Sequence, residues 1–230
     1  FERYESLHRR LLSFADEALG ILLDGMDADT SLVVVSDHGL MASRRWLWVN
    51  RYLAQNGYIT YTKDADGRVH VDWSRTRAYV SAFLILNANL RGREPDGIVE
   101  PGQQYEELKR ELIELLRGWK DPETGQHVMS DVFDPRADGA FYGLGSEMDG
   151  DVRYFAAPGY SVYRATAVGG GEAITDIHGP YLGDHGSCRP TARFGRGGEP
   201  GIFYAAGHGF RRGYRRPRPV FPCDVMPTLL

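Results

Sequence analysis

The sequence predicts an α/β fold with a largely parallel sheet flanked by helices, and three observations support this prediction. The chain has 230 residues, 42% of them hydrophobic and 25% charged, which is ordinary for a globular protein with one large domain. Residues 32–35 are an unbroken apolar run, Leu-Val-Val-Val, of the kind found in strands that are covered on both faces. Segments with helical and strand-like periodicity alternate along the chain, as in a sheet covered by helices.

The first quarter of the chain is predicted to hold two helices around this strand. Apolar side chains recur every three or four positions in residues 4–22, and Gly25 can end that helix in a left-handed conformation. The apolar strand follows at residues 31–36. Residues 46–55 show a second helical pattern, which the turn pair Asn56-Gly57 stops.

The middle of the chain alternates between short strands and one longer helix. Residues 58–61 are predicted to begin a short strand, and residues 78–80 and 83–86 are also strand-like. Residues 103–117 form a helix, because their tyrosine and leucine side chains share one face. The sequence Asp-Pro-Glu-Thr-Gly at 121–125 is then a turn.

Two long segments lack periodicity and contain many glycines. These are residues 137–151 and 168–200, and loops of this length in a compact domain usually serve function or move. Residues 201–207 are the last clear strand. A terminal helix follows at residues 224–230, with Pro222 suited to its first turn.

The pentapeptide Ser36-Asp37-His38-Gly39-Leu40 is the first candidate site, because ligands in such sheets bind beyond the carboxyl ends of the strands. Neighbouring side chains on a strand point to opposite faces, so Asp37 and His38 can reach one ion only if the backbone turns, which Gly39 permits. Two interpretations are open for this motif alone. One is a metal site, and the other is a turn in which Asp37 caps the backbone and His38 is an ordinary polar residue.

A second Asp-His-Gly triplet occurs at Asp184, His185 and Gly186, shortly before the last predicted strand. Enzymes that hydrolyse phosphate esters often use two divalent ions, and carboxylate and imidazole groups are ligands that zinc takes. Each triplet alone is a weak signal, but together they favour a metal site with two sets of ligands.

Composition and charge limit the other possibilities. The net charge of −4 gives no general attraction to nucleic acid or to an anionic membrane, and no apolar run is long enough to cross a bilayer. The two cysteines lack the spacing of a metal or disulfide motif, so they do not decide between a cytoplasmic and an exported protein. The chain starts at Phe1 with neither a methionine nor a signal peptide, and we expect it to begin within a longer protein.

Several stretches resemble the type I phosphodiesterase/nucleotide pyrophosphatase enzymes of the alkaline phosphatase superfamily. The first is Val33-Val34-Val35-Ser36-Asp37-His38-Gly39-Leu40, together with the helix before it. Residues 89–99 and 121–125 resemble a bacterial-type subgroup of these hydrolases, as do residues 184–187 leading to the strand at 201–207. The resemblance covers nearly the whole chain in the expected order. It implies an alkaline-phosphatase-like fold and a two-metal hydrolase of phosphate esters.

The resemblance also implies roles for individual residues. Asp37 and His38 would bind the divalent ion that holds the nucleophile, and His185 would bind the second ion, both ions being zinc. The nucleophilic threonine or serine, which would form a covalent phospho-enzyme, and the remaining ligands would lie upstream of Phe1, so no catalytic nucleophile is expected in this chain. Residues 1–230 would then be the C-terminal portion of one domain, with a loop-rich insertion at approximately 58–180.

Alternatives and departures from the family pattern accompany this interpretation. A phosphomutase of the same superfamily is one alternative, and a non-catalytic binding domain is another if the protein truly begins at Phe1. His208 and Cys188 stand where the family often has other residues. His178 is a third possible ligand near His185, but it is interpreted as structural because the resemblance gives it no role. The basic cluster at 211–218 is interpreted as a solvated loop. The expected partner is a small phosphorylated substrate, with neither nucleic acid nor membrane.

Overall fold

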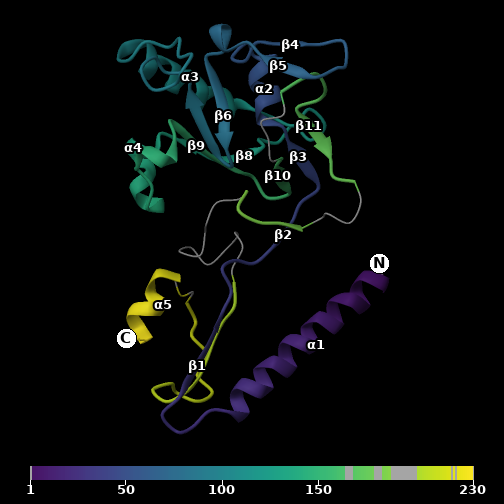
Figure 1. Ribbon diagram of the computed structural model, residues 1–230, viewed down its shortest axis with the longest axis vertical. Helices are drawn as coiled ribbons and strands as arrows, with labels where there is room; N and C mark the ends of the chain where they lie inside the picture. Colours follow the sequence, from purple (N-terminus) through teal and green to yellow (C-terminus); the bar gives the residue numbers. More distant parts are fainter. Residues whose placement is uncertain are drawn as a thin grey trace. The chain divides into compact units, whose positions relative to one another are not determined.

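The computed structural model describes residues 2–163, 168–178, 183–187, 201–218, 220 and 222–229 (Figure 1). The chain divides into two compact units. The first unit comprises Phe1–Gly39 and Pro200–Leu230, and the second comprises Leu40–Glu199. Helices and strands are mixed throughout, which fits the predicted α/β class.

The first unit consists of two helices and a two-stranded ribbon. Its helices are α1 (Glu2–Asp24) and α5 (Pro222–Leu229). Strands β1 (Ser31–Val35) and β13 (Phe203–Gly207) run side by side and pair antiparallel along their whole length (Figure 1). The sequence predicted all four elements, because each carries a clear apolar period or an unbroken apolar run.

Apolar side chains of the first unit are widely exposed. Val35 is 51% exposed, and the middle of β1 is half-buried, so the predicted cover on both faces of this strand is not found in the described residues. Helix α1 exposes a set of large apolar side chains, namely Tyr4, Leu7, Leu11, Leu12, Phe14, Ile21, Leu22 and Leu23. An apolar surface of this extent is typical of an interface with other protein surface.

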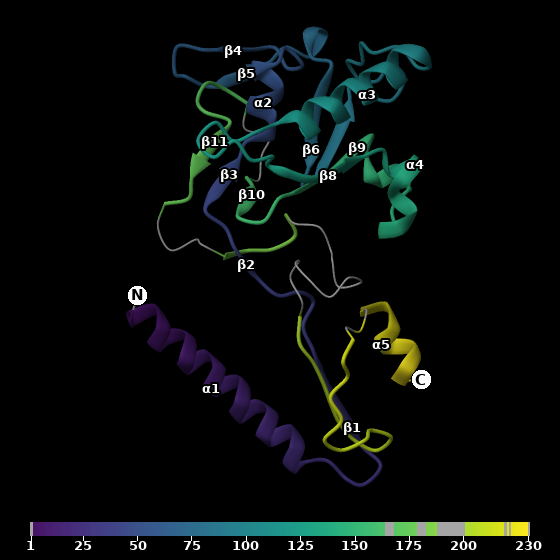
Figure 2. The ribbon, with the colours of Figure 1, turned by 180° about the vertical axis from the view of Figure 1, so that it is seen from behind.

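The second unit is built on a four-stranded antiparallel sheet in the order β6-β7-β9-β8. Figure 2 labels β6, β8 and β9 of this sheet. Its strands are β6 (Ala78–Ala82), β7 (Ile85–Ala88), β9 (Val152–Ala156) and β8 (Met129–Phe133). Helix α3 (Gln103–Gly118) packs against β7, β8 and β9. The core between them is formed by the fully buried side chains Leu86, Leu108, Leu112, Leu116, Val128, Val132, Val152 and Tyr154.

A second, smaller sheet corrects one helix prediction. Strand β3 (Arg45–Leu47) lies between β10 (Tyr160–Val162) and β11 (Ile174–Asp176), parallel to β10 and antiparallel to β11. Helix α2 therefore spans only Val49–Gln55, and the prediction of helix at residues 46 and 47 is wrong. Pairing with two strands distant in the sequence determines the conformation there, and local periodicity does not detect it.

The remaining elements of the second unit are short. Strands β4 (Tyr61–Lys63) and β5 (Val69–Val71) form a hairpin, and β2 (Met41–Ala42) pairs antiparallel with β12 (Gly183–Asp184). The short helical turns are η1 (Trp73–Arg75), α4 (Pro135–Asp138), η2 (Gly139–Tyr142) and η3 (Glu147–Asp149).

Several other predictions about the backbone are not met. The largely parallel sheet is not confirmed, because β3–β10 is the single parallel pair among the named strands in the described part of the chain. Gly25 does not adopt a left-handed conformation, since it is not among the glycines with a positive φ. Strands β8, β9 and β10 were not predicted at all.

The predicted insertion at approximately 58–180 falls inside the second unit, where it contains the four-stranded sheet and α3. Whether this segment is an insertion into a larger domain stays a prediction. Among the described residues, no helix has both the length and the apolar character needed to span a membrane.

A buried carboxylate holds one end of the four-stranded sheet together. The carboxylate of Asp151, just before β9, is fully buried and accepts two hydrogen bonds from the Arg93 guanidinium (2.7 and 2.8 Å). The Tyr105 hydroxyl on α3 donates to it at 2.6 Å, and the backbone N–H of Ala88 on β7 donates at 2.7 Å. One carboxylate thus joins a loop, a helix and two strands.

We expect the protein to lose stability in acid because three buried or partly buried carboxylates have lowered pKa values. Burial alone would raise the pKa of Asp121, Asp134 and Asp151, but hydrogen bonds and nearby cations outweigh it and bring each pKa below the ordinary value of 3.8. A depressed folded-state pKa stabilises the fold above the unfolded-state value, and this stability is lost as the pH falls through the folded-state value. The melting temperature, followed by circular dichroism, should therefore fall steeply below about pH 4. A melting temperature that stays constant from neutral pH down to about pH 2 would contradict this expectation.

Candidate metal centre

The Asp37-His38 motif follows β1, and Ser36 fixes the backbone immediately before it. The Ser36 N–H donates to the carbonyl of Ile202 (3.1 Å), and its hydroxyl oxygen accepts from the Ile202 N–H (2.7 Å). Gly201 is needed beside this contact, because a Cβ atom there would lie 2.3 Å from the Ser36 hydroxyl oxygen. The end of β1 is therefore held by its partner strand segment at the point where the motif begins.

Asp37 and His38 turn toward each other. The distance from Asp37 Oδ2 to His38 Nε2 is 3.2 Å, and Asp37 Oδ1 accepts a hydrogen bond from the His38 backbone N–H (2.9 Å). The Asp37 side chain is 84% exposed and the His38 side chain 35% exposed. The backbone turn that the metal-site interpretation required is present, and Asp37 also caps the backbone as the alternative interpretation required.

The orientation of the His38 ring suits a metal ligand. Its Nδ1 lies 2.8 Å from the carbonyl oxygen of Gly39, which can only accept, so Nδ1 donates there and Nε2 is the ring nitrogen that faces Asp37. Metal-binding histidines commonly donate their second ring nitrogen to a carbonyl in this way. Two donors on a tetrahedral zinc with bonds of about 2.0–2.2 Å lie about 3.3–3.6 Å apart, close to the observed separation. The donor pair therefore fits one divalent ion.

The pair is only part of a complete ligand set. Within the described ranges, no three histidine, cysteine, aspartate or glutamate side chains gather closely enough to hold a metal ion. A structural zinc site takes four protein ligands, and a catalytic site usually takes three. A metal centre at this place would therefore need at least one ligand in addition to Asp37 and His38.

His185 lies in the second unit, at the tip of a turn that two neighbours hold. Asp184 ends β12, and its Oδ2 accepts a hydrogen bond from the hydroxyl of Ser187 (2.6 Å). Ser187 is buried, and its hydroxyl oxygen accepts from the N–H of Val162 on β10 (3.0 Å). Gly186 has a φ of 79°, a backbone conformation that residues other than glycine rarely adopt. These contacts present the exposed His185 side chain on a fixed loop.

The structure brings Asp37 and His38 together, and it places His185 in the other unit, so a centre shared by all three stays a prediction. Sequence reasoning missed Ser36 and Ser187, which anchor the two motifs. A small polar residue beside each Asp-His pair was the available signal. Of the other residues considered, His178 and His208 are exposed, and Cys188 lies outside the described residues.

The basic cluster at 211–218 is exposed along its whole length, as the interpretation of a solvated loop requires. Within it, the Arg211 guanidinium lies over the Tyr214 ring, 5.8 Å from its centre. The His208 backbone closes the ribbon next to this cluster, because its N–H donates to Thr30 and its carbonyl accepts from the Ser31 hydroxyl (2.6 Å). His208 therefore has a structural role through its main chain.

Comparison with known protein families supports the resemblance identified from the motifs. Residues 4–186 match the family described as type I phosphodiesterase / nucleotide pyrophosphatase. No curated protein and no solved structure gives a significant match. The match covers most of the chain, including β1, the Asp37-His38 pair and the turn of His185. The chain therefore belongs to the type I phosphodiesterase/nucleotide pyrophosphatase family of phosphate-ester hydrolases.

Proposed function

We propose that this chain contributes ligands to the two-metal centre of a hydrolase that cleaves small phosphate esters, with Asp37 and His38 on one zinc ion and His185 on the other. The observation that carries the proposal is the convergence of Asp37 Oδ2 and His38 Nε2 at 3.2 Å directly after β1. Family membership supports the reaction class, and the family is generally metal-dependent.

In the proposed reaction, the ions stabilise charge and the residues of this chain position the ions. Two bound divalent ions would balance the charge of the phosphoryl group and stabilise the attacking and leaving oxygens. The residues of this chain would position them: the Gly39 carbonyl orients the His38 ring, and the Asp184–Ser187 contact holds the turn that carries His185. Fixed ligands of this kind avoid reorganisation during the reaction.

The attacking hydroxyl is proposed to come from a residue outside this chain, and to form a covalent phospho-enzyme. The two hydroxyls nearest the proposed ligands already have structural roles. Ser36 binds the Ile202 N–H, and Ser187 bridges Asp184 and the Val162 N–H. A nucleophilic hydroxyl needs a neighbouring base or metal in place of such contacts. Neither serine is therefore assigned to the attack.

The substrate is proposed to be a small phosphate ester. The net charge of −4 provides no general attraction to nucleic acid, whose affinity for proteins depends largely on neutralising its phosphates. The charge of a single ester can instead be met locally by the two ions.

We expect the His185→Ala variant to lose part of its zinc and at least about tenfold in turnover, since loss of even an outer-shell partner costs metal sites about 10–100-fold. The measurement is zinc per chain by mass spectrometry, together with hydrolysis of bis(p-nitrophenyl) phosphate. The protein is expressed with its natural flanking sequence. His178→Ala is the matched control, because His178 is an exposed histidine of the same unit. A folded His185→Ala protein with unchanged zinc content and rate would refute the assignment.

A further inference from the structure

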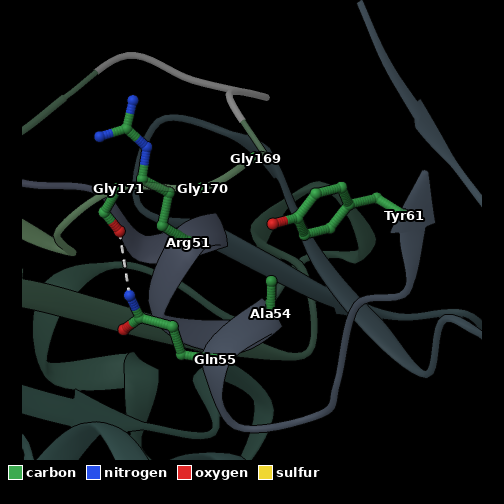
Figure 3. A pocket seen from close by; sticks show the side chains of 7 residues that line it. All are labelled: Arg51, Ala54, Gln55, Tyr61, Gly169, Gly170 and Gly171. Carbon is green, nitrogen blue, oxygen red and sulfur yellow. Dashed lines mark hydrogen bonds between the residues drawn. The ribbon is translucent and has the colours of Figure 1, made fainter. Parts of the chain in front are cut away.

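A small pocket lies in the second unit between helix α2 and the glycine run 169–171 (Figure 3). Arg51, Ala54 and Gln55 line it from α2, and Tyr61 lines it from β4. Its volume is about 130 Å³. One water occupies about 30 Å³ in the liquid, and pockets for drug-sized ligands begin at about 300 Å³. The pocket therefore suits a group of a few heavy atoms.

The glycine run brings the main chain against two cationic side chains. A Cβ atom at Gly170 would lie 3.6 Å from Lys63 Nζ, and one at Gly171 would lie 3.2 Å from Arg51 Nη1. Gly169 and Gly171 both have a φ of 129°, so a side chain would strain either position. The absence of side chains in the run therefore leaves space beside both cations, Arg51 in the pocket lining and Lys63 next to Gly170.

Neither cation is neutralised by a carboxylate within the described residues. Lys63 and Arg51 form no ion pair there. Arg51 contacts Glu172 through its carbonyl oxygen (3.3 Å from Nη1), and the guanidinium carbon lies 3.6 Å from the centre of the Trp48 ring. Arg51 Nε is buried and has no hydrogen-bond acceptor in the described part of the chain. A buried guanidinium nitrogen usually has an acceptor.

Further residues with hydrogen-bond donors line the same pocket. The Tyr61 ring reaches from β4 with its hydroxyl directed toward the pocket (Figure 3). The Gln55 amide donates to the Gly171 carbonyl (3.1 Å) and so holds the glycine run on α2. In the described residues, the N–H groups of the three glycines donate to no acceptor. Two cations, a hydroxyl and main-chain N–H groups form a donor set that matches an oxyanion.

We propose that Arg51, Lys63 and the glycine run 169–171 bind a single phosphate group, as inorganic phosphate or as the phosphate of a small monoester. Phosphate matches the two positive charges, and its size matches the pocket volume. The site uses none of the residues assigned to the metal centre, so it does not depend on the proposed hydrolysis.

The test is a titration with inorganic phosphate of the whole protein with its natural flanking sequence. The backbone N–H signals of residues 169–171 are followed by nuclear magnetic resonance. We expect these signals to shift with a Kd in about the millimolar range or tighter. Lys63→Gln and Arg51→Gln should each raise that Kd about tenfold or more, because each removes a charge-assisted contact. Arg110→Gln, which changes an exposed arginine of α3, is the matched control and should leave the Kd unchanged.

Gly170→Ala provides a second variant that leaves both charges in place. Gly170 has an ordinary backbone conformation, so alanine should fold there, and its methyl group would occupy the space next to Lys63 Nζ. We expect the same loss of phosphate binding. Glycerol phosphate in place of inorganic phosphate separates a monoester site from a site for the free ion. The proposal is overturned if the N–H signals do not respond to millimolar phosphate, or if they respond equally in the Lys63→Gln and Arg51→Gln variants.

Discussion

Replacing Asp151 with alanine is expected to lower the free energy of unfolding by about 3–5 kcal/mol, because the change removes a fully buried carboxylate and leaves the buried groups that donate to it without an acceptor. Asp151 is fully buried, and it accepts two hydrogen bonds from Arg93 and one each from Tyr105 and the Ala88 N–H. Its loss therefore leaves three donor groups on a loop, a helix and a strand without their acceptor. Urea unfolding followed by circular dichroism measures the effect.

The matched control is Asp66→Ala. Asp66 is exposed, and its carboxylate has no hydrogen-bond partner in the described part of the chain, so its removal should change stability by no more than about 0.5 kcal/mol. Tyr105→Phe is an intermediate case, because it removes a single hydrogen bond to a charged group, worth about 1.5–3 kcal/mol. Equal stabilities of the Asp151 and Asp66 variants would show that the ion pair does not hold the sheet.

A double-mutant cycle separates the ion pair from the other contacts of Asp151. If Arg93 and Asp151 stabilise the fold mainly through each other, the double variant should be less destabilised than the sum of the two single variants.

The contacts of Asp151 also affect the ionisation of the Tyr105 hydroxyl. Burial raises the pKa of Tyr105 to about 12, and its hydrogen bond to Asp151 adds to the shift. The hydroxyl thus stays protonated and able to donate at all physiological pH values.

Elements with strong local periodicity could be predicted from the sequence. In α3, Tyr105, Leu108, Leu112 and Leu116 are buried at helical spacing, as expected for residues 103–117. Asn56 and Gly57 end α2 as predicted, and Gly57 has a φ of 78°. In these segments the local preference and the tertiary contacts agree, and a single sequence then carries enough information.

Strand pairing between distant segments could not be predicted in the same way. Trp46 lies on β3 because β10 and β11, more than a hundred residues later, pair with it on both sides. Strand β1 has the composition of a central parallel strand, but its described partner β13 runs antiparallel. Both outcomes depend on non-local hydrogen bonding, which leaves little trace in the local pattern.

The candidate site shows the same division. The Asp37-His38 pair was predicted because both residues are adjacent and follow an apolar strand, and the structure confirms that their side chains approach each other. The anchoring contact of Ser36 with Ile202 joins residues far apart in the sequence and was missed. Arg51 and Lys63 were missed for the same reason, since the glycine run that brings them together lies far along the chain.

Replacing Asp37 with asparagine is expected to lower turnover at least about a hundredfold and to remove zinc from the protein. A residue that binds the metal directly matters more than the residues that orient the ligands, whose loss costs about 10–100-fold. This substitution separates the two interpretations of the motif. Asparagine keeps the side-chain oxygen that caps the His38 N–H, and it is favoured in turns of this kind, so a purely structural Asp37 would be replaced at little cost. The amide is neutral and is a poorer zinc ligand than a carboxylate. Unchanged melting temperature with lost zinc therefore identifies a ligand.

A second aspartate–histidine pair in the chain supplies the matched control. Asp64 and His70 approach to 3.1 Å across the β4–β5 hairpin, nearly the same separation as Asp37 and His38. The aspartate–histidine distance alone would make both pairs equally good candidates for metal ligands. However, the other ring nitrogen of His38 is oriented by the Gly39 carbonyl, and His70 has no such contact in the described residues. Asp64→Asn should accordingly leave zinc content and turnover unchanged. If Asp37→Asn retains both as fully as Asp64→Asn does, the motif is a turn and the metal ligands lie elsewhere.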